Sequence, residues 1–127
     1  MKILGLDLGT RRSGMAIAEE DFIFGRGTIS GWENWQLFID ELKGAIAKEN
    51  IKKIVVGIPH SASGEAAQKA REVVDRIKKE IGDITIDEID ETLTSKEAQR
   101  RAGTNRGDDN EEAAKIILED YLKKNPN

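Results

Sequence analysis

The sequence predicts an α/β fold, built on a mixed five-stranded sheet flanked by helices. Two observations lead to this prediction. The chain opens with apolar runs separated by turn residues, and from Glu33 onward apolar residues recur at a spacing of three and four between short β-branched runs. Strands joined by short turns pair antiparallel, whereas strands that alternate with helices favour parallel pairing. We therefore expect three antiparallel strands followed by parallel ones.

The opening apolar run, residues 3–8, is interrupted by one charged residue, Asp7. A nearly continuous apolar strand is usually covered on both faces, where an ionised carboxylate must be paired, hydrogen-bonded or bound to a cation. Gly9-Thr10 and Ser13-Gly14 permit a tight reversal into the apolar run 15–18, which predicts a β-hairpin with Asp7 on its first strand. Taken alone, however, Asp7 also fits an aspartate that caps a turn.

The later elements follow from the same signals. The glycines at 25 and 27 suggest a bulge or a close backbone approach in the third strand, and the final helix is expected to begin with a cap at Asp109. The predicted elements are a strand at 22–30, a helix from 33 to about 50, a strand at 53–58, a helix at 66–81, a strand at 84–89, a short helix at 94–102 and a final helix from 109. This order of strands and helices is that of ribonuclease H-like folds.

Composition limits the classes of protein that the chain can belong to. Its 127 residues suit one domain, residues 1–127, and they include no cysteine for a disulfide or a thiolate metal site. No segment resembles a signal peptide and no apolar run could span a bilayer, so we expect a soluble cytoplasmic protein. The net charge of −4 argues mildly against a protein that coats nucleic acid. Five arginines could still form a local basic patch that binds phosphate, or they could be ordinary solvated side chains. They are Arg11, Arg12, Arg100, Arg101 and Arg106.

Four segments, in order, carry a resemblance to a known family. They are Gly-Leu-Asp-Leu-Gly-Thr at 5–10, Val-Val-Gly-Ile-Pro at 55–59 followed by Gly64, Asp-Glu-Thr-Leu-Thr-Ser-Lys-Glu-Ala at 90–98, and the helical run 113–122. Together they resemble the YqgF family, described as Holliday junction resolvases and, in bacteria, as pre-16S ribosomal RNA nucleases. The resemblance spans nearly the whole chain and implies a ribonuclease H-like fold.

The resemblance also implies a chemistry, which is hydrolysis of phosphodiester bonds assisted by Mg²⁺ or Mn²⁺. Carboxylates from the first strand, a later strand end and the last helix would converge on the metal, because such hard cations prefer oxygen ligands. Asp7 corresponds to the first of these carboxylates and Glu91 to the second, with Asp90 as a weaker substitute. The implied substrate is structured RNA or branched DNA. We expect the five arginines to position its phosphate backbone. The protein would be a monomer or a homodimer.

The third carboxylate is where this sequence departs from the family pattern. Counting back from the Ala113-Ala114 pair, the family's aspartate falls on Asn110, which can offer an amide oxygen to a metal but is neutral and cannot act as a base. Asp109 could compensate, although it also fits the helix cap. The predicted catalytic residues are thus Asp7, Glu91 and Asn110, with Asp109 as a further metal ligand. Thr92 replaces the family's arginine.

Three functions remain open from the sequence. The preferred hypothesis is a metal-dependent nuclease, and the second is a nucleic-acid-binding or ribosome-assembly factor whose catalysis is weakened by Asn110. The third takes Asp7-Leu8-Gly9-Thr10 as the phosphate loop of an actin-like sugar kinase or ATPase, but such proteins need a second, similar domain to close over the nucleotide. His60 is the only histidine, and no serine–histidine–acid set can be built around it.

Overall fold

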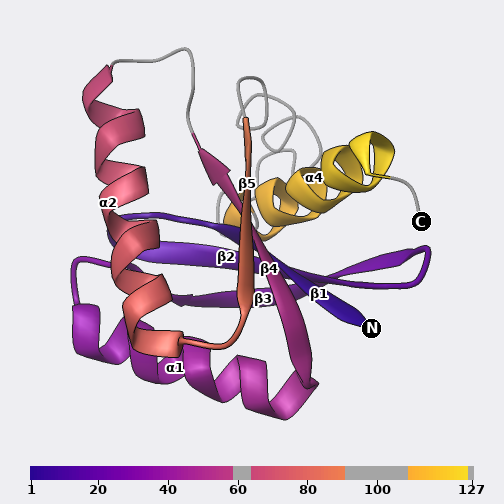
Figure 1. Ribbon diagram of the computed structural model, residues 1–127, viewed down its shortest axis with the longest axis horizontal. Helices are drawn as coiled ribbons and strands as arrows, with labels where there is room; N and C mark the ends of the chain where they lie inside the picture. Colours follow the sequence, from indigo (N-terminus) through magenta and orange to yellow (C-terminus); the bar gives the residue numbers. More distant parts are fainter. Residues whose placement is uncertain (59–63, 91–108, 126–127) are drawn as a thin grey trace.

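The computed structural model describes residues 1–58, 64–90 and 109–125, and these form the predicted α/β fold (Figure 1). None of the helices in these ranges is long and apolar enough to cross a membrane. The elements are β1 Lys2–Asp7, β2 Arg12–Glu19, β3 Phe22–Ser30, α1 Trp35–Glu49, β4 Ile51–Ile58, α2 Gly64–Ile81, β5 Thr85–Asp90 and α4 Asp109–Lys124. The short helix predicted at 94–102 lies outside the described residues.

The five strands form one sheet in the order β3-β2-β1-β4-β5, which places β1 at its centre. β2 pairs antiparallel with both β1 and β3, whereas β1 with β4 and β4 with β5 pair parallel. The predicted mixture of three antiparallel strands followed by parallel ones is therefore confirmed. Because β1 and β4 run parallel, their carboxyl ends lie at the same edge of the sheet.

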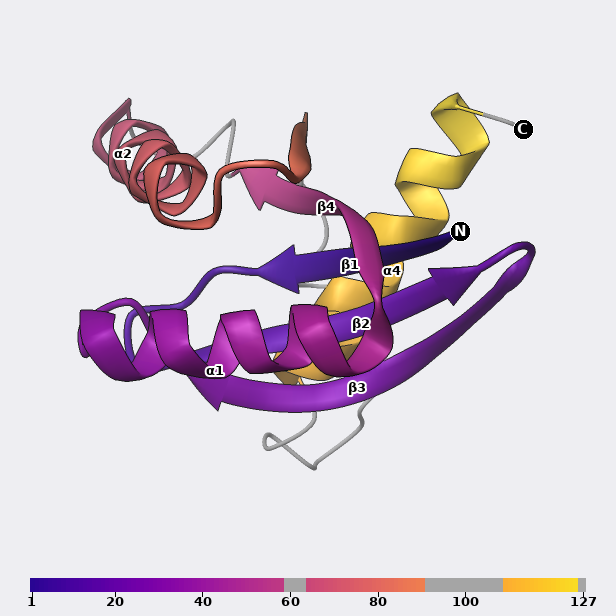
Figure 2. The same cartoon turned by 60° about the horizontal axis from the view of Figure 1, so that its bottom comes forward.

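Helices cover both faces of the sheet, with α1 and α2 on one face and α4 on the other (Figure 2). Alternation along β1 divides its side chains between them: Leu4 and Leu6 pack in the core beneath α1 and α2, and Ile3 packs beneath α4. The nearly continuous apolar run of β1 thus belongs to a strand that is covered on both faces, as predicted. The same alternation places Asp7 on the α4 face.

The two glycines of β3 mark an irregularity, as the sequence predicted. The register between β2 and β3 shifts between Gly14 and Ala16, and Gly27 adopts a positive φ of 79°. At Gly25 an added Cβ would overlap the side chain of Glu111 from α4. A bulge and a close approach are therefore both present, and together they let α4 lie against this part of the sheet.

A hydrogen bond between Arg26 and Glu49 connects the irregular part of β3 to the end of α1. The Arg26 Nε–H donates to Glu49 Oε2 at 2.9 Å, and Lys2 Nζ lies 3.6 Å from the other carboxylate oxygen. The Arg26 hydrogen bond holds the pKa of Glu49 below its ordinary value.

This lowered pKa predicts a pH dependence of stability. A carboxyl group whose pKa is lower in the folded protein than in the unfolded chain stabilises the fold above its unfolded pKa. That stabilisation is lost as the pH falls from about 4.5 through the folded value. We expect Glu49→Gln to lower the free energy of unfolding at pH 7, and the difference from wild type to shrink below pH 4.5, as measured by urea unfolding. A difference that stays constant between pH 7 and pH 3 would contradict this assignment.

Candidate active site

Asp7 is the last residue of the central strand and lies half-buried at the carboxyl edge of the sheet. It faces α4, and its register partner on β2 is Gly14. An acidic side chain in this position, at the carboxyl end of a parallel pair, lies where ligands commonly bind in α/β sheets.

The start of α4 lies directly against Gly14. A Cβ atom added to Gly14 would overlap the backbone carbonyl of Asn110, so only glycine permits this approach. Farther along the helix, a Cβ on Gly5 would come within 2.8 Å of the Ala114 carbonyl oxygen. Asn110 is thus placed beside the register partner of Asp7, and the structure brings these two predicted site residues to neighbouring positions.

A half-buried acidic side chain, that of Glu111, fixes the start of α4 to β3, on the other side of β2 from β1. Glu111 Oε2 accepts a hydrogen bond from the backbone N–H of Gly27 at 2.6 Å, and its side chain packs over Gly25. No role was predicted for Glu111 from the sequence. The only available signal was the pair of glycines in β3, which indicated a close approach but not the residue that makes it.

The other end of α4 is fastened to β4 and β5. The Tyr121 hydroxyl donates to Asp87 Oδ2 at 2.6 Å and accepts from Lys53 Nζ at 3.0 Å. The hydrogen bond to Tyr121 raises the pKa of Lys53, so the lysine stays protonated in this network. With both ends of the helix attached to the sheet, the position of Asn110 relative to Asp7 is set by packing and hydrogen bonds.

The loop that follows Asp7 is held by backbone hydrogen bonds to the segment after β3. Trp32 N–H donates to the Gly9 carbonyl at 3.1 Å, and Glu33 N–H donates to the Thr10 carbonyl at 3.0 Å. The buried Ser13 hydroxyl accepts from Gly9 N–H at 3.1 Å. These bonds give the turn a defined shape, which the sequence predicted only as a reversal.

Of the five predicted arginines, Arg11 lies in this loop and Arg12 is the first residue of β2. Arg11 and Arg12 are both exposed. Because side chains alternate along β2, Arg12 lies on the same face of the sheet as Gly14, which is the α4 face. Arg12 is thus on the same face of the sheet as Asp7. Glu91, Arg100, Arg101 and Arg106 lie outside the described residues, as do His60, Thr92 and the side chain of Asp109.

The substitute carboxylate, Asp90, lies on the other face of the sheet. Side chains alternate between the two faces along β5, so Asp90 lies on the same face as Ile86 and Glu88. Ile86 packs against the core beneath α1 and α2. Glu88 Oε1 lies 3.8 Å from Arg71 Nε of α2. Asp90 therefore does not share the α4 face with Asp7. Within the described ranges, no three His, Asp or Glu side chains lie together as ligands for one metal ion.

The sheet order, the helices on both faces and the carboxylate at the end of the central strand define a ribonuclease H-like protein. The chain belongs to the RuvX family, which is the YqgF family of the sequence resemblance, and the family model, described as "Holliday junction resolvase", matches residues 1–124.

Individual relatives match nearly the whole chain. A protein of Flavobacterium psychrophilum is 30% identical over 95% of this chain and 96% of its own length. One of Acaryochloris marina is 33% identical over 97% and 92%. Both carry the name "Putative pre-16S rRNA nuclease". Among solved structures, T. thermophilus RuvC in complex with a Holliday junction substrate matches with a TM-score of 0.64 at 12% identity, covering 98% of this chain and 96% of that one. This last likeness shows the fold alone.

Proposed function

We propose that this protein is a divalent-metal-dependent nuclease that hydrolyses phosphodiester bonds in structured nucleic acid, either precursor ribosomal RNA or branched DNA. The observation that carries the proposal is the position of Asp7, at the carboxyl end of the central strand and beside the start of α4. The family name and the names of the relatives indicate the same chemistry.

The two candidate ligands in this part of the structure are the carboxylate of Asp7 and the side-chain amide of Asn110, and each can offer an oxygen atom. Such donors suit Mg²⁺ or Mn²⁺, which prefer oxygen ligands. We propose that Glu91 and Asp109 add the further negative charge that the metal requires. Glu91 follows Asp90, the last residue of β5, directly in the sequence. When bound, the metal would activate the attacking water and stabilise the leaving oxygen.

The chain's own residues hold the metal and the substrate in this proposal. Asp7 supplies a fixed negative charge, since its strand lies at the centre of the sheet. Arg12, on the same face, would contact a phosphate beside the bond that is cut, and Arg11 would contact the backbone farther away. Arg100, Arg101 and Arg106 would extend this contact surface along the nucleic acid.

A cleavage assay tests the function directly. Purified protein is incubated with a precursor 16S ribosomal RNA fragment and, separately, with a four-way DNA junction, each with Mn²⁺ or with EDTA. We expect cleavage of at least one substrate that depends on the metal, and the substrate that is cut distinguishes RNA from DNA. Binding of both substrates without cleavage in Mn²⁺ would overturn the nuclease proposal and favour the binding or assembly factor.

Asn110 predicts a gain of activity on substitution. Asn110→Asp adds a negative charge beside Asp7, and we expect Mn²⁺-dependent cleavage to rise by about tenfold, because metal affinity follows the charge of the ligand set. The helix should tolerate the change, since acidic residues are favourable near a helix N-terminus. The matched control is Asn34→Asp, which adds the same charge at the N-cap of α1. Equal cleavage rates for wild type and Asn110→Asp would exclude residue 110 from the site.

A further inference from the structure

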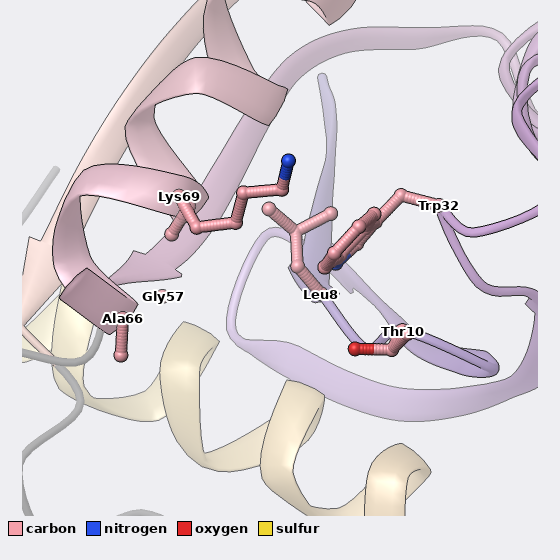
Figure 3. Close-up of a pocket in the computed structure, with 7 residues that line it drawn as sticks. Leu8, Thr10, Trp32, Gly57, Ala66 and Lys69 are labelled. Carbon is pink, nitrogen blue, oxygen red and sulfur yellow. The ribbon is translucent and has the colours of Figure 1, made fainter.

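A pocket of about 260 Å³ opens on the α2 side of the sheet, next to the loop that follows Asp7. Figure 3 shows the Trp32 ring, Leu8 and Thr10 on one side of this space and Ala66 and Lys69 of α2 on the other. The pocket therefore combines an aromatic ring, an aliphatic side chain, a hydroxyl and an amine. Its volume is just below the range of about 300–1,000 Å³ typical of sites for drug-sized ligands, so it can hold one small planar group.

The amine and the aromatic ring in this pocket already interact. Lys69 Nζ lies 5.0 Å from the centroid of the Trp32 ring, a cation–π distance. Among the residues that the structure describes, the same amine also lies 3.9 Å from Glu72 Oε2, and the Lys69 side chain is 55% exposed. Exposed pairs of this kind are weak, so Lys69 can leave the ring for an anion at small cost.

The pocket begins one residue from Asp7. Leu8 follows Asp7 directly, and its side chain packs on the α1 and α2 face, opposite to the face of Asp7. Trp32 is joined to the same loop through its backbone hydrogen bond to Gly9. A nucleic-acid strand that is bound at Asp7 and continues across this edge of the sheet would reach the pocket.

We propose that this pocket receives one unpaired nucleotide of the nucleic-acid substrate, with its base stacked on Trp32 and its phosphate paired with Lys69. The proposal rests on the nuclease function and names a feature of the substrate, an unpaired base near the cut. A nucleotide has the required chemistry, because it carries a planar aromatic group and an anionic phosphate a few bonds apart. Base–aromatic stacking is also stronger than the exposed cation–π contact that it would replace.

The chain's second tryptophan supplies a matched control. Trp35 also carries a cation on its ring, since the Arg76 guanidinium lies 3.8 Å from the ring centroid. Trp35→Phe leaves Trp32 as the sole tryptophan, so that the fluorescence of this variant reports on the pocket alone.

Two measurements test the proposal. First, the Trp35→Phe protein is titrated with a single-stranded oligonucleotide, a duplex of the same sequence and ATP, all in EDTA so that no cleavage occurs. We expect the single strand to quench the fluorescence at a lower concentration than ATP does, because the strand is also held at the Asp7 site, and the duplex to leave the fluorescence unchanged. Second, single-strand affinity is measured by fluorescence anisotropy of a labelled oligonucleotide. We expect Trp32→Ala to weaken it by about tenfold, Lys69→Met to weaken it severalfold, and Trp32→Phe and Trp35→Phe to retain it.

The outcomes separate this proposal from the nuclease function. Wild-type cleavage together with unchanged affinity of a folded Trp32→Ala protein would overturn the pocket and leave the nuclease intact. Quenching by ATP but not by the single strand would assign the pocket to a free nucleotide and also overturn the proposal. Thermal unfolding of each variant verifies that it is folded, and Trp32→Phe tests stacking by retaining a ring if Trp32→Ala does not fold.

Discussion

Replacing Asp7 with asparagine should reduce metal-dependent cleavage by more than about a hundredfold. Replacing a residue that only orients a metal ligand already costs about 10- to 100-fold in metal affinity or activity. Asp7 is proposed to contact the metal itself, so its replacement should cost more. Asparagine retains the size of the side chain and one oxygen but lacks the negative charge. Cleavage rates measured with saturating Mn²⁺, on whichever substrate wild type cuts, give the size of the loss.

Asp90→Asn is the matched control for this experiment. It removes the same charge from the end of a strand at the same edge of the sheet, but on the opposite face from Asp7. We expect this variant to retain cleavage within a few-fold of wild type, and both variants to unfold at temperatures close to that of wild type. Equal activity of Asp7→Asn and wild type would show that the catalytic site lies elsewhere.

Gly14→Ala should be among the most damaging glycine-to-alanine changes in the described part of the protein. The added Cβ would overlap the backbone of Asn110 and approach Glu111 N to 2.8 Å, and neither group can rotate away as a side chain would. We expect a loss of about 1–3 kcal/mol in the free energy of unfolding, the usual effect of overpacking. Cleavage should fall as well, by about a hundredfold for a displacement of 1 Å at the start of α4.

A second glycine provides the comparison for Gly14. Gly44 lies within α1, and a Cβ added there would meet nothing within 4 Å. Gly44→Ala should therefore stabilise the protein by about 1 kcal/mol through helix propensity and leave cleavage unchanged. Urea unfolding and cleavage rates of both variants check the pair. If Gly14→Ala proved as stable and active as Gly44→Ala, the described contact between α4 and β2 would be wrong.

Much of the fold could be predicted from the sequence because its elements are set by local patterns. The apolar run 3–8, which Asp7 interrupts, predicted the first strand, and the change to a spacing of three and four predicted α1 and α2 close to their observed bounds. The glycines in β3 predicted its irregularity. Each of these signals is contained within a few neighbouring residues.

The contacts that build the site were harder to predict, because they join residues that are distant in the sequence. Ser13-Gly14 was interpreted as part of a turn, whereas Gly14 lies within β2 and is needed for the approach of α4. Nothing local to Glu111 indicates its bond to Gly27. In the same way, Trp32 and Lys69 come together only because α2 packs beside the loop after β1.

The placement of Asn110 near Asp7 depends both on a local sequence pattern and on a contact between residues that are distant in the sequence. Counting back from the Ala113-Ala114 pair assigned the family's aspartate to position 110, and the structure places the backbone of Asn110 against the register partner of Asp7. The roles of the two side chains, and those of Glu91 and Asp109, remain predictions. Residue 110 is also where the sequence departs from the family pattern, so we expect the charge at this position to affect how strongly a metal is held.

Isothermal titration with Mn²⁺ tests the central claim most directly, because the claim is that Asp7 forms a metal site on the α4 face. The titration compares wild type with Asp7→Asn, Asp90→Asn and Asn110→Asp. We predict binding by wild type, loss of that binding in Asp7→Asn, little change in Asp90→Asn and tighter binding in Asn110→Asp. Equal Mn²⁺ affinity in wild type and Asp7→Asn would contradict the claim.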